Sequence, residues 1–111
     1  MKLVSIVPSD RKGKKFKAVF EHQGSGETKK TTTTHFGASG YRDFTLMSNP
    51  ESKFYIKNSG EREKVRQAYL RRHANENWMK PMTAGALSRW ILWEKRTVPA
   101  AVRAFRKKFS V

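Results

Sequence analysis

The sequence predicts an α+β fold, with a small N-terminal antiparallel sheet (a hairpin or a three-stranded meander) followed by about three C-terminal helices. Two observations carry this prediction. Residues 1–46 contain short β-branched segments separated by turn residues, which is typical of strands. In residues 60–109 the apolar residues instead recur every three or four positions, which is typical of helices. The 111 residues match the size of one small basic domain, residues 1–111.

The first two strands are expected at residues 3–7 and 16–22. The first is short and β-branched, and Pro8 ends it. In the second, Phe16, Ala18 and Phe20 fall on one face at a period of two. We expect that face to point to the core.

A third strand is expected at residues 28–36, which contain four consecutive threonines of high strand propensity. The turn before it is assigned to Gln23-Gly24-Ser25-Gly26, because glycine adopts the positive φ that a tight reversal needs. After a link punctuated by glycines at residues 36–41, residues 43–46 are interpreted as one more short extended piece.

Two helices are expected next. Good helix formers fill residues 61–70, where Val65 and Tyr69 lie four positions apart on one side. Thr83 is a suitable N-cap for a helix over residues 84–93, whose apolar stripe indicates a central position in the fold.

The clearest amphipathic segment is a third helix capped by Thr97, with Pro99 in its first turn. Its apolar stripe consists of Val98, Ala101, Val102, Phe105 and Phe109, and its other side carries Arg103, Arg106 and Lys107.

The charge of the chain indicates the chemistry of its partners. Lys and Arg number 24 against 9 Asp and Glu, a formal charge of +15 and a pI of about 10.6. Such a surface is drawn to polyanions, acidic protein faces or anionic membranes. Residues 1–30 and 61–111 are strongly basic, whereas residues 31–60 carry a net charge of only +1. The chain therefore has two basic ends.

Basic side chains in these two ends are the candidate partner-binding or polyanion-binding residues. A solvated face whose lysines only block edge pairing is the alternative interpretation of each cluster. The first cluster is Lys12, Lys14, Lys15, Lys17, Lys29 and Lys30, and the second is Arg103, Arg106, Lys107 and Lys108.

Catalytic and metal-binding motifs are not found in the sequence. His22, His35 and His73 share no metal-ligand spacing, and the absence of Cys excludes disulfides and thiolate zinc sites. The glycines at residues 24–26 do not lead into a Gly-Lys-Ser/Thr phosphate-binding loop. We therefore expect no enzyme activity, no cofactor, no metal and no small-molecule substrate. No segment has the apolar length of a signal peptide or membrane span, so we expect a soluble intracellular protein.

Three segments together resemble a family of small basic proteins encoded by large double-stranded DNA viruses, notably those of algae. They are FGASGYRDFT at residues 36–45, RRHANENW at 71–78 and TAGALSRWILW at 83–93; FKAVF at 16–20 fits the same pattern. The resemblance extends over roughly residues 14–109. It carries over no catalytic or binding residue, but it implies a location in the virion, and inside the host cell during assembly.

Two functions are consistent with these features. The first is a non-enzymatic minor capsid or cement protein, binding the major capsid protein and other virion proteins with acidic surfaces through basic faces and aromatic anchors. An anionic membrane surface is a further candidate partner. The alternative is sequence-independent DNA binding during genome packaging. We favour the first, because the charge lies at two separated ends and the 13 aromatic residues exceed the needs of a small core.

Overall fold

Three antiparallel strands form one sheet in the order β1-β2-β3 in the computed structural model, which describes residues 1–24, 26 and 28–111. The strands are β1 (Lys2–Pro8), β2 (Lys14–Gln23) and β3 (Lys29–Ala38). The predicted N-terminal meander is therefore confirmed. The predicted turn at residues 23–26 includes Ser25, which lies outside the described residues; beside it, the Gly24 amide donates to the Thr28 carbonyl at 2.7 Å.

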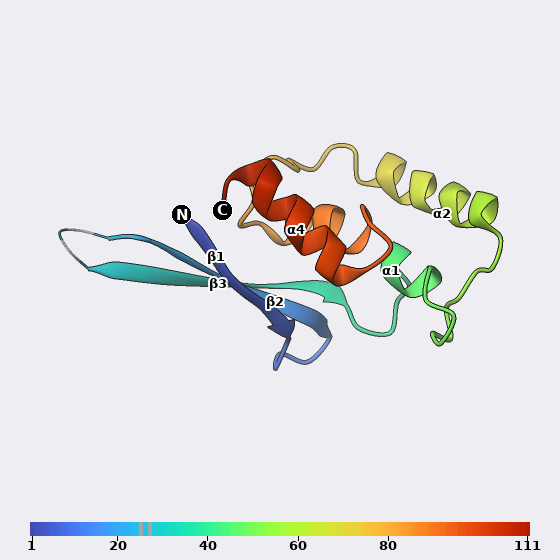
Figure 1. Cartoon of the computed structure of the whole chain (residues 1–111), viewed down its shortest axis with the longest axis horizontal. Coiled ribbons are helices and arrows are strands. Elements are labelled where there is room, and N and C mark those ends of the chain that lie inside the picture. The colour runs from blue at the N-terminus through green and yellow to red at the C-terminus, as the bar shows by residue number, and fades with distance from the viewer. Residues whose placement is uncertain (25, 27) are drawn as a thin grey trace.

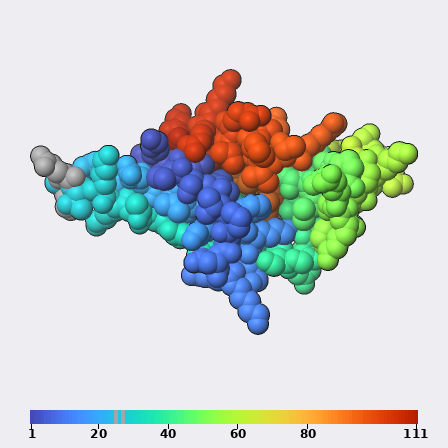
Figure 2. All heavy atoms as spheres, turned by 60° about the horizontal axis from the view of Figure 1, so that its bottom comes forward, coloured from blue at the N-terminus to red at the C-terminus, as the bar shows by residue number. Residues whose placement is uncertain are grey.

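The period-two pattern of β2 explains which face of the sheet is buried. Ala18 and Phe20 are fully buried and Phe16 packs against the same cluster, as predicted. In the register of β2 and β3, Phe16 lies opposite Phe36, and the two rings stack with centroids 6.0 Å apart. Figure 2 shows β1 and the start of β2, in blue, at the front with no helix over them.

Helices follow the sheet, as predicted. They are α1 (Phe44–Met47), α2 (Ser59–Arg72), α3 (Ala84–Leu87), the π-helical turn η1 (Ser88–Leu92) and α4 (Val98–Phe109). Thr83 and Thr97 accept hydrogen bonds from the amides of Ala86 and Ala100, so both predicted N-caps are confirmed.

The prediction of an extended segment at residues 43–46 is wrong. Asp43 is instead the N-cap of α1, and its carboxylate accepts hydrogen bonds from the Leu46 amide at 3.0 Å and from the Thr45 hydroxyl. A cap that satisfies the first amides of so short a helix outweighs the strand propensity of Phe44 and Thr45.

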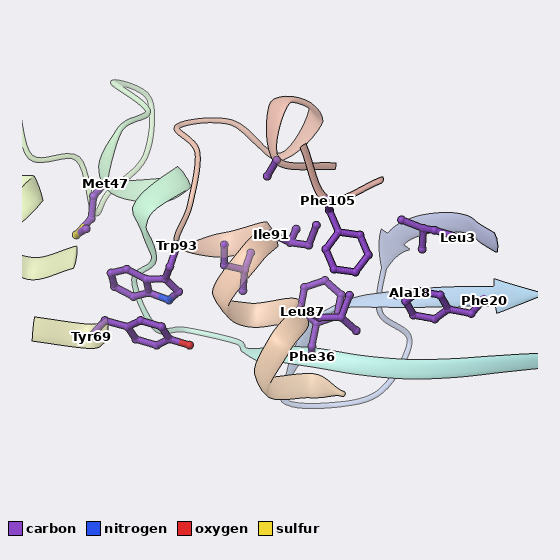
Figure 3. Close-up of a cluster of buried hydrophobic side chains, with 12 residues drawn as sticks. Leu3, Ala18, Phe20, Phe36, Met47, Tyr69, Leu87, Ile91, Trp93 and Phe105 are labelled. Atoms are coloured by element: carbon purple, nitrogen blue, oxygen red, sulfur yellow. The ribbon is translucent and has the colours of Figure 1, made fainter. Parts of the chain in front are cut away.

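The core lies between the sheet and the helices α3, η1 and α4 (Figure 3). Phe105 of α4 packs on Phe20 with ring centroids 6.4 Å apart. Toward α2 the core continues as an aromatic stack, in which the Trp93 ring lies parallel to Tyr69 at 4.1 Å. The molecule measures 53 × 26 × 22 Å, and the β2–β3 hairpin extends beyond the helices in Figure 1. In the described part of the chain, no helix combines the length and apolar character needed to cross a membrane.

Replacing Phe36, which is fully buried, by Ala is expected to lower the free energy of unfolding by about 3–5 kcal/mol, because apolar contacts are lost and a cavity is left. Urea unfolding followed by circular dichroism measures this change. Tyr41→Ala is the control: its side chain is 71% exposed, so a shift of less than about 0.5 kcal/mol is expected. Equal losses in the two variants would contradict the described core.

Candidate functional site

Two hollows flank one buried ion pair, between Lys15 of β2 and Asp43 at the start of α1. We call them the apolar groove and the basic cleft. The apolar groove lies between the end of the sheet, α1 and the start of α4, and its volume is about 910 Å³. The basic cleft lies between the same end of the sheet, the last turn of α2 and the α3–η1 segment, and its volume is about 460 Å³.

The ion pair is almost completely removed from water. The Lys15 ammonium lies 2.6 Å from Oδ2 of Asp43, and the two side chains are only 13% and 3% exposed. Lys15 also donates to the Tyr41 carbonyl at 2.6 Å. Because the other carboxylate oxygen accepts from Thr45 and Leu46, every partner that this carboxylate needs comes from the fold.

Most of the surface exposed in the apolar groove is apolar, although polar residues such as Ser48 and Asn49 also line it. Leu46 of α1 and Val98 of α4 contribute from its two sides, and Phe16 contributes from the sheet. Arg96, which is exposed, lines the groove just before α4 begins. The groove therefore combines an apolar interior with positive charge at its edge.

The basic cleft has a different lining. Lys14, Arg42 and Arg72 line it, and none of these exposed side chains has an acidic partner within the part of the chain that the structure describes. Its two carboxylates are both engaged, Asp43 by Lys15 and Glu76 by Nδ1 of His73. The cleft is consequently a positively charged hollow.

Tyr69 lines the basic cleft between two other rings. It stacks on His73 at 4.3 Å and on Trp93 at 4.1 Å, and Figure 3 shows the Trp93 ring beside it. Burial raises the pKa of Tyr69 to about 12, and the nearby Glu76 carboxylate adds to the effect. The Tyr69 hydroxyl therefore keeps its proton at neutral pH.

Six of the ten predicted binding residues are exposed and form no ion pair with a described residue. Lys17 and Lys29 form looser pairs, with Asp10 and Glu21, each at 3.4 Å. Lys108 is exposed and its ammonium lies 4.3 Å from the centre of the Trp90 ring. The six are Lys12, Lys14, Lys30, Arg103, Lys107 and Lys108.

The other two predicted binding residues contradict the expectation of an outward charge. Lys15 is held by Asp43, as described above. Arg106 is half-buried, and its guanidinium donates to the Leu3 carbonyl of β1, which ties α4 to the edge of the sheet. Both cations are therefore assigned to the internal structure.

The aromatic residues of α4 face inward. Phe105 is buried, and Phe109 packs beside it with ring centroids 4.9 Å apart. They are not available as the protruding anchors that the sequence suggested. The large apolar side chains that are exposed lie elsewhere: Met1, Val4, Val7, Tyr41, Tyr55 and Met79.

Each histidine is bonded within the fold. His22 bonds the Thr32 hydroxyl, His35 the Ser9 hydroxyl and His73 the Glu76 carboxylate. In the described residues, no three His, Cys, Asp or Glu side chains gather in a way that could hold a metal ion.

Lys14 and Lys15 belong to the first predicted cluster, but the other residues that line the two hollows were not predicted as site residues. Leu46 and Val98 look like core positions, and Arg42 and Arg72 belong to neither predicted cluster. One signal was available: Asp43 before a short apolar run is a possible helix N-cap, which would have suggested α1.

Residues 4–57 match the sequence model of a family of unknown function, DUF5754. The match covers just under half of the chain and includes most of the sheet, α1 and the Lys15–Asp43 pair. No curated protein and no solved structure matches the chain.

Replacing Lys15 by Met is expected to lower the free energy of unfolding by about 3–5 kcal/mol, because the buried Asp43 carboxylate loses its counter-charge. The double variant Lys15→Met with Asp43→Asn should lose less free energy of unfolding than the single variant, because no charge remains buried. Urea unfolding of both variants, with Lys14→Met as the exposed control, measures the difference. A single variant as stable as the control would show that the pair does not hold the fold together.

Alkaline pH is expected to destabilise the protein through Tyr69. The pKa in the folded state, about 12, lies above the ordinary value of 10, so the stabilisation is complete below pH 10 and is lost as the pH rises through 12. An ultraviolet titration of tyrosinate should show a step near pH 12 that Tyr69→Phe lacks. The same titration curve in both proteins would refute the assignment.

Proposed function

We propose that the protein is a non-enzymatic binding protein that docks on an acidic surface of a larger protein, as a minor structural component of a virus particle. The observation that carries this proposal is the apolar groove of about 910 Å³ beside the exposed Arg96. The resemblance to small basic proteins of large DNA viruses supplies the virion setting.

The groove supports docking by receiving a partner's side chain. Anchor residues of protein interfaces are buried in well-packed apolar pockets, while polar residues at the rim set orientation. The aromatic side chains of α4 face the core and are not available to insert into a partner. In this proposal the partner contributes the anchor side chain, and the apolar groove of this protein receives it.

The charge supports an acidic partner. Within the described residues, six of the eight Asp and Glu side chains form ion pairs with other residues of the chain, whereas most of the 24 Lys and Arg side chains do not. The outward field is therefore strongly positive, which speeds encounter with acidic surfaces and opposes self-association.

One observation favours the alternative, sequence-independent binding of DNA. Exposed lysines lie at both ends of the β2–β3 hairpin. Lys14 is at the start of β2, and Lys30 of β3 lies opposite His22, which is eight residues further along β2. At the rise of a strand this separation is about 27 Å, enough to contact several phosphates.

Replacing Val98 by Asp is expected to weaken binding to an acidic, apolar peptide of alternating Glu and Leu residues by about tenfold or more, because a carboxylate in the groove repels the ligand. The new carboxylate suits the N-terminal turn of α4, so the fold should be retained. Fluorescence anisotropy with a labelled peptide measures the affinity.

Two controls make this experiment decisive. Val4→Asp makes the same chemical change at a 47% exposed position of β1 and should weaken binding by less than about threefold. A peptide of Glu alone should bind much more weakly than the Glu-Leu peptide. Equal effects of the two variants, or equal binding of the two peptides, would contradict docking in the groove.

Titration with unrelated DNA duplexes across a salt series distinguishes docking on a protein from sequence-independent DNA binding. Docking on protein predicts weak DNA binding that disappears near physiological salt. Tight binding with a steep dependence on salt, indifferent to sequence and retained in competition with the Glu-Leu peptide, would favour DNA coating.

A further inference from the structure

The basic cleft brings together residues from four parts of the chain. They are the paired ends of β2 and β3 with Lys14 and Ala38, the link after β3 with Tyr41 and Arg42, the last turn of α2 with Arg72, and α3 and η1 with Gly85 and Ser88. Its volume of about 460 Å³ lies within the range of small-molecule pockets. The cleft is therefore a product of the tertiary fold.

The charge in the cleft is suited to an anion. Lys14, Arg42 and Arg72 project from three different segments, and among the described residues no acidic side chain pairs with them. Arginines that line one cleft and are not paired with carboxylates suit a phosphate group, because the guanidinium group matches two phosphate oxygens.

The two carboxylates in the cleft are bonded to other residues and do not pair with these cations. Asp43 has a side chain only 3% exposed and is satisfied by Lys15, Thr45 and Leu46. Glu76 bonds His73 through Oε2, and its Oε1 packs against Gly85, where a Cβ atom would lie only 2.7 Å away. Because glycine has no side chain at position 85, the Glu76 carboxylate has room to bond His73.

A neutral donor and an aromatic surface complete the cleft. The hydroxyl of Tyr69 has no hydrogen-bond partner among the described residues, and its ring is fixed by stacking on His73 and Trp93. Tyr41, which also lines the cleft, is 71% exposed beside Arg42. An exposed aromatic ring next to a phosphate-binding arginine suits a nucleobase.

We propose that the basic cleft binds the phosphate of a nucleoside monophosphate, with Arg42, Arg72 and Lys14 on the phosphate and Tyr41 against the base. The monophosphate can be a free nucleotide or the 5′-phosphorylated end of a strand. This site is separate from the apolar groove, and it does not depend on the docking function proposed for that groove.

The test is the affinity of the full chain for four probes: inorganic phosphate, dAMP, and one short single-stranded oligonucleotide with either a 5′-phosphate or a 5′-hydroxyl. Calorimetry measures the two small probes, and fluorescence anisotropy measures the 3′-labelled oligonucleotides. Arg72→Gln should weaken binding of dAMP by about tenfold or more. Arg71→Gln is the matched control: it is adjacent, exposed and makes the same charge change outside the cleft, so its effect should stay within about twofold.

Two further variants separate the parts of the site. Tyr69→Phe removes only the hydroxyl, and it should weaken inorganic phosphate and dAMP to the same degree. Tyr41→Ala should weaken dAMP and leave inorganic phosphate unchanged.

Each outcome bears on the proposal. Tighter binding of the 5′-phosphorylated oligonucleotide than of its 5′-hydroxyl form supports a strand end as the ligand, and binding of dAMP without this difference supports a free nucleotide. No binding of dAMP or of the phosphorylated oligonucleotide, or equal losses in Arg71→Gln and Arg72→Gln, would overturn the site. Val98→Asp, the variant of the apolar groove, should leave dAMP affinity unchanged, so a failure of either proposal is recognised separately.

Discussion

The buried ion pair of Lys15 and Asp43 is the interaction on which the rest of the structure depends. Removing two charges from water is costly, and such a pair persists only where the remaining hydrogen bonds of both groups are satisfied. Here the Tyr41 carbonyl, the Thr45 hydroxyl and the Leu46 amide satisfy them. The pair joins the start of β2 to the start of α1, across 28 residues of sequence, and it forms part of the wall of both hollows. The pair therefore fixes the position of two lining residues that the apolar groove and the basic cleft share.

The distribution of the other charged and aromatic residues follows a simple division. Most acidic side chains are used inside the molecule, in pairs such as Glu94 with Arg66 and Arg89. Most aromatic side chains are also used inside, in the core between sheet and helices and in the Tyr69–Trp93 stack. The surface is left with cations and two hollows of different character. A basic surface with an apolar groove suits an acidic protein partner, whereas a basic cleft with an exposed aromatic ring suits a phosphate-bearing ligand.

The sequence was sufficient for features that depend on local pattern. The inward face of β2 followed from its period of two, and the starts of α3 and α4 followed from the caps Thr83 and Thr97. It was insufficient where the decisive partner is distant. The period of two in β2 would place Lys15 on the outward face, and the sequence does not show that a carboxylate from the loop after the sheet buries it. Arg106 was likewise assigned outward because its partner, the Leu3 carbonyl, lies at the other end of the chain. Both hollows are formed by such distant contacts, so neither could be predicted.

Docking of an acidic partner in the apolar groove is tested most directly by nuclear magnetic resonance. The peptide of alternating Glu and Leu residues is added to the isotope-labelled protein at physiological salt, and the changes in amide chemical shift are mapped onto the structure. Docking in the apolar groove predicts changes centred on Leu46, Ser48 and Val98, which line it from α1 and α4. Changes spread over the exposed lysines, such as Lys12, Lys30 and Lys107, with Leu46 and Val98 unaffected, would contradict the account. They would show that the peptide is attracted by charge alone.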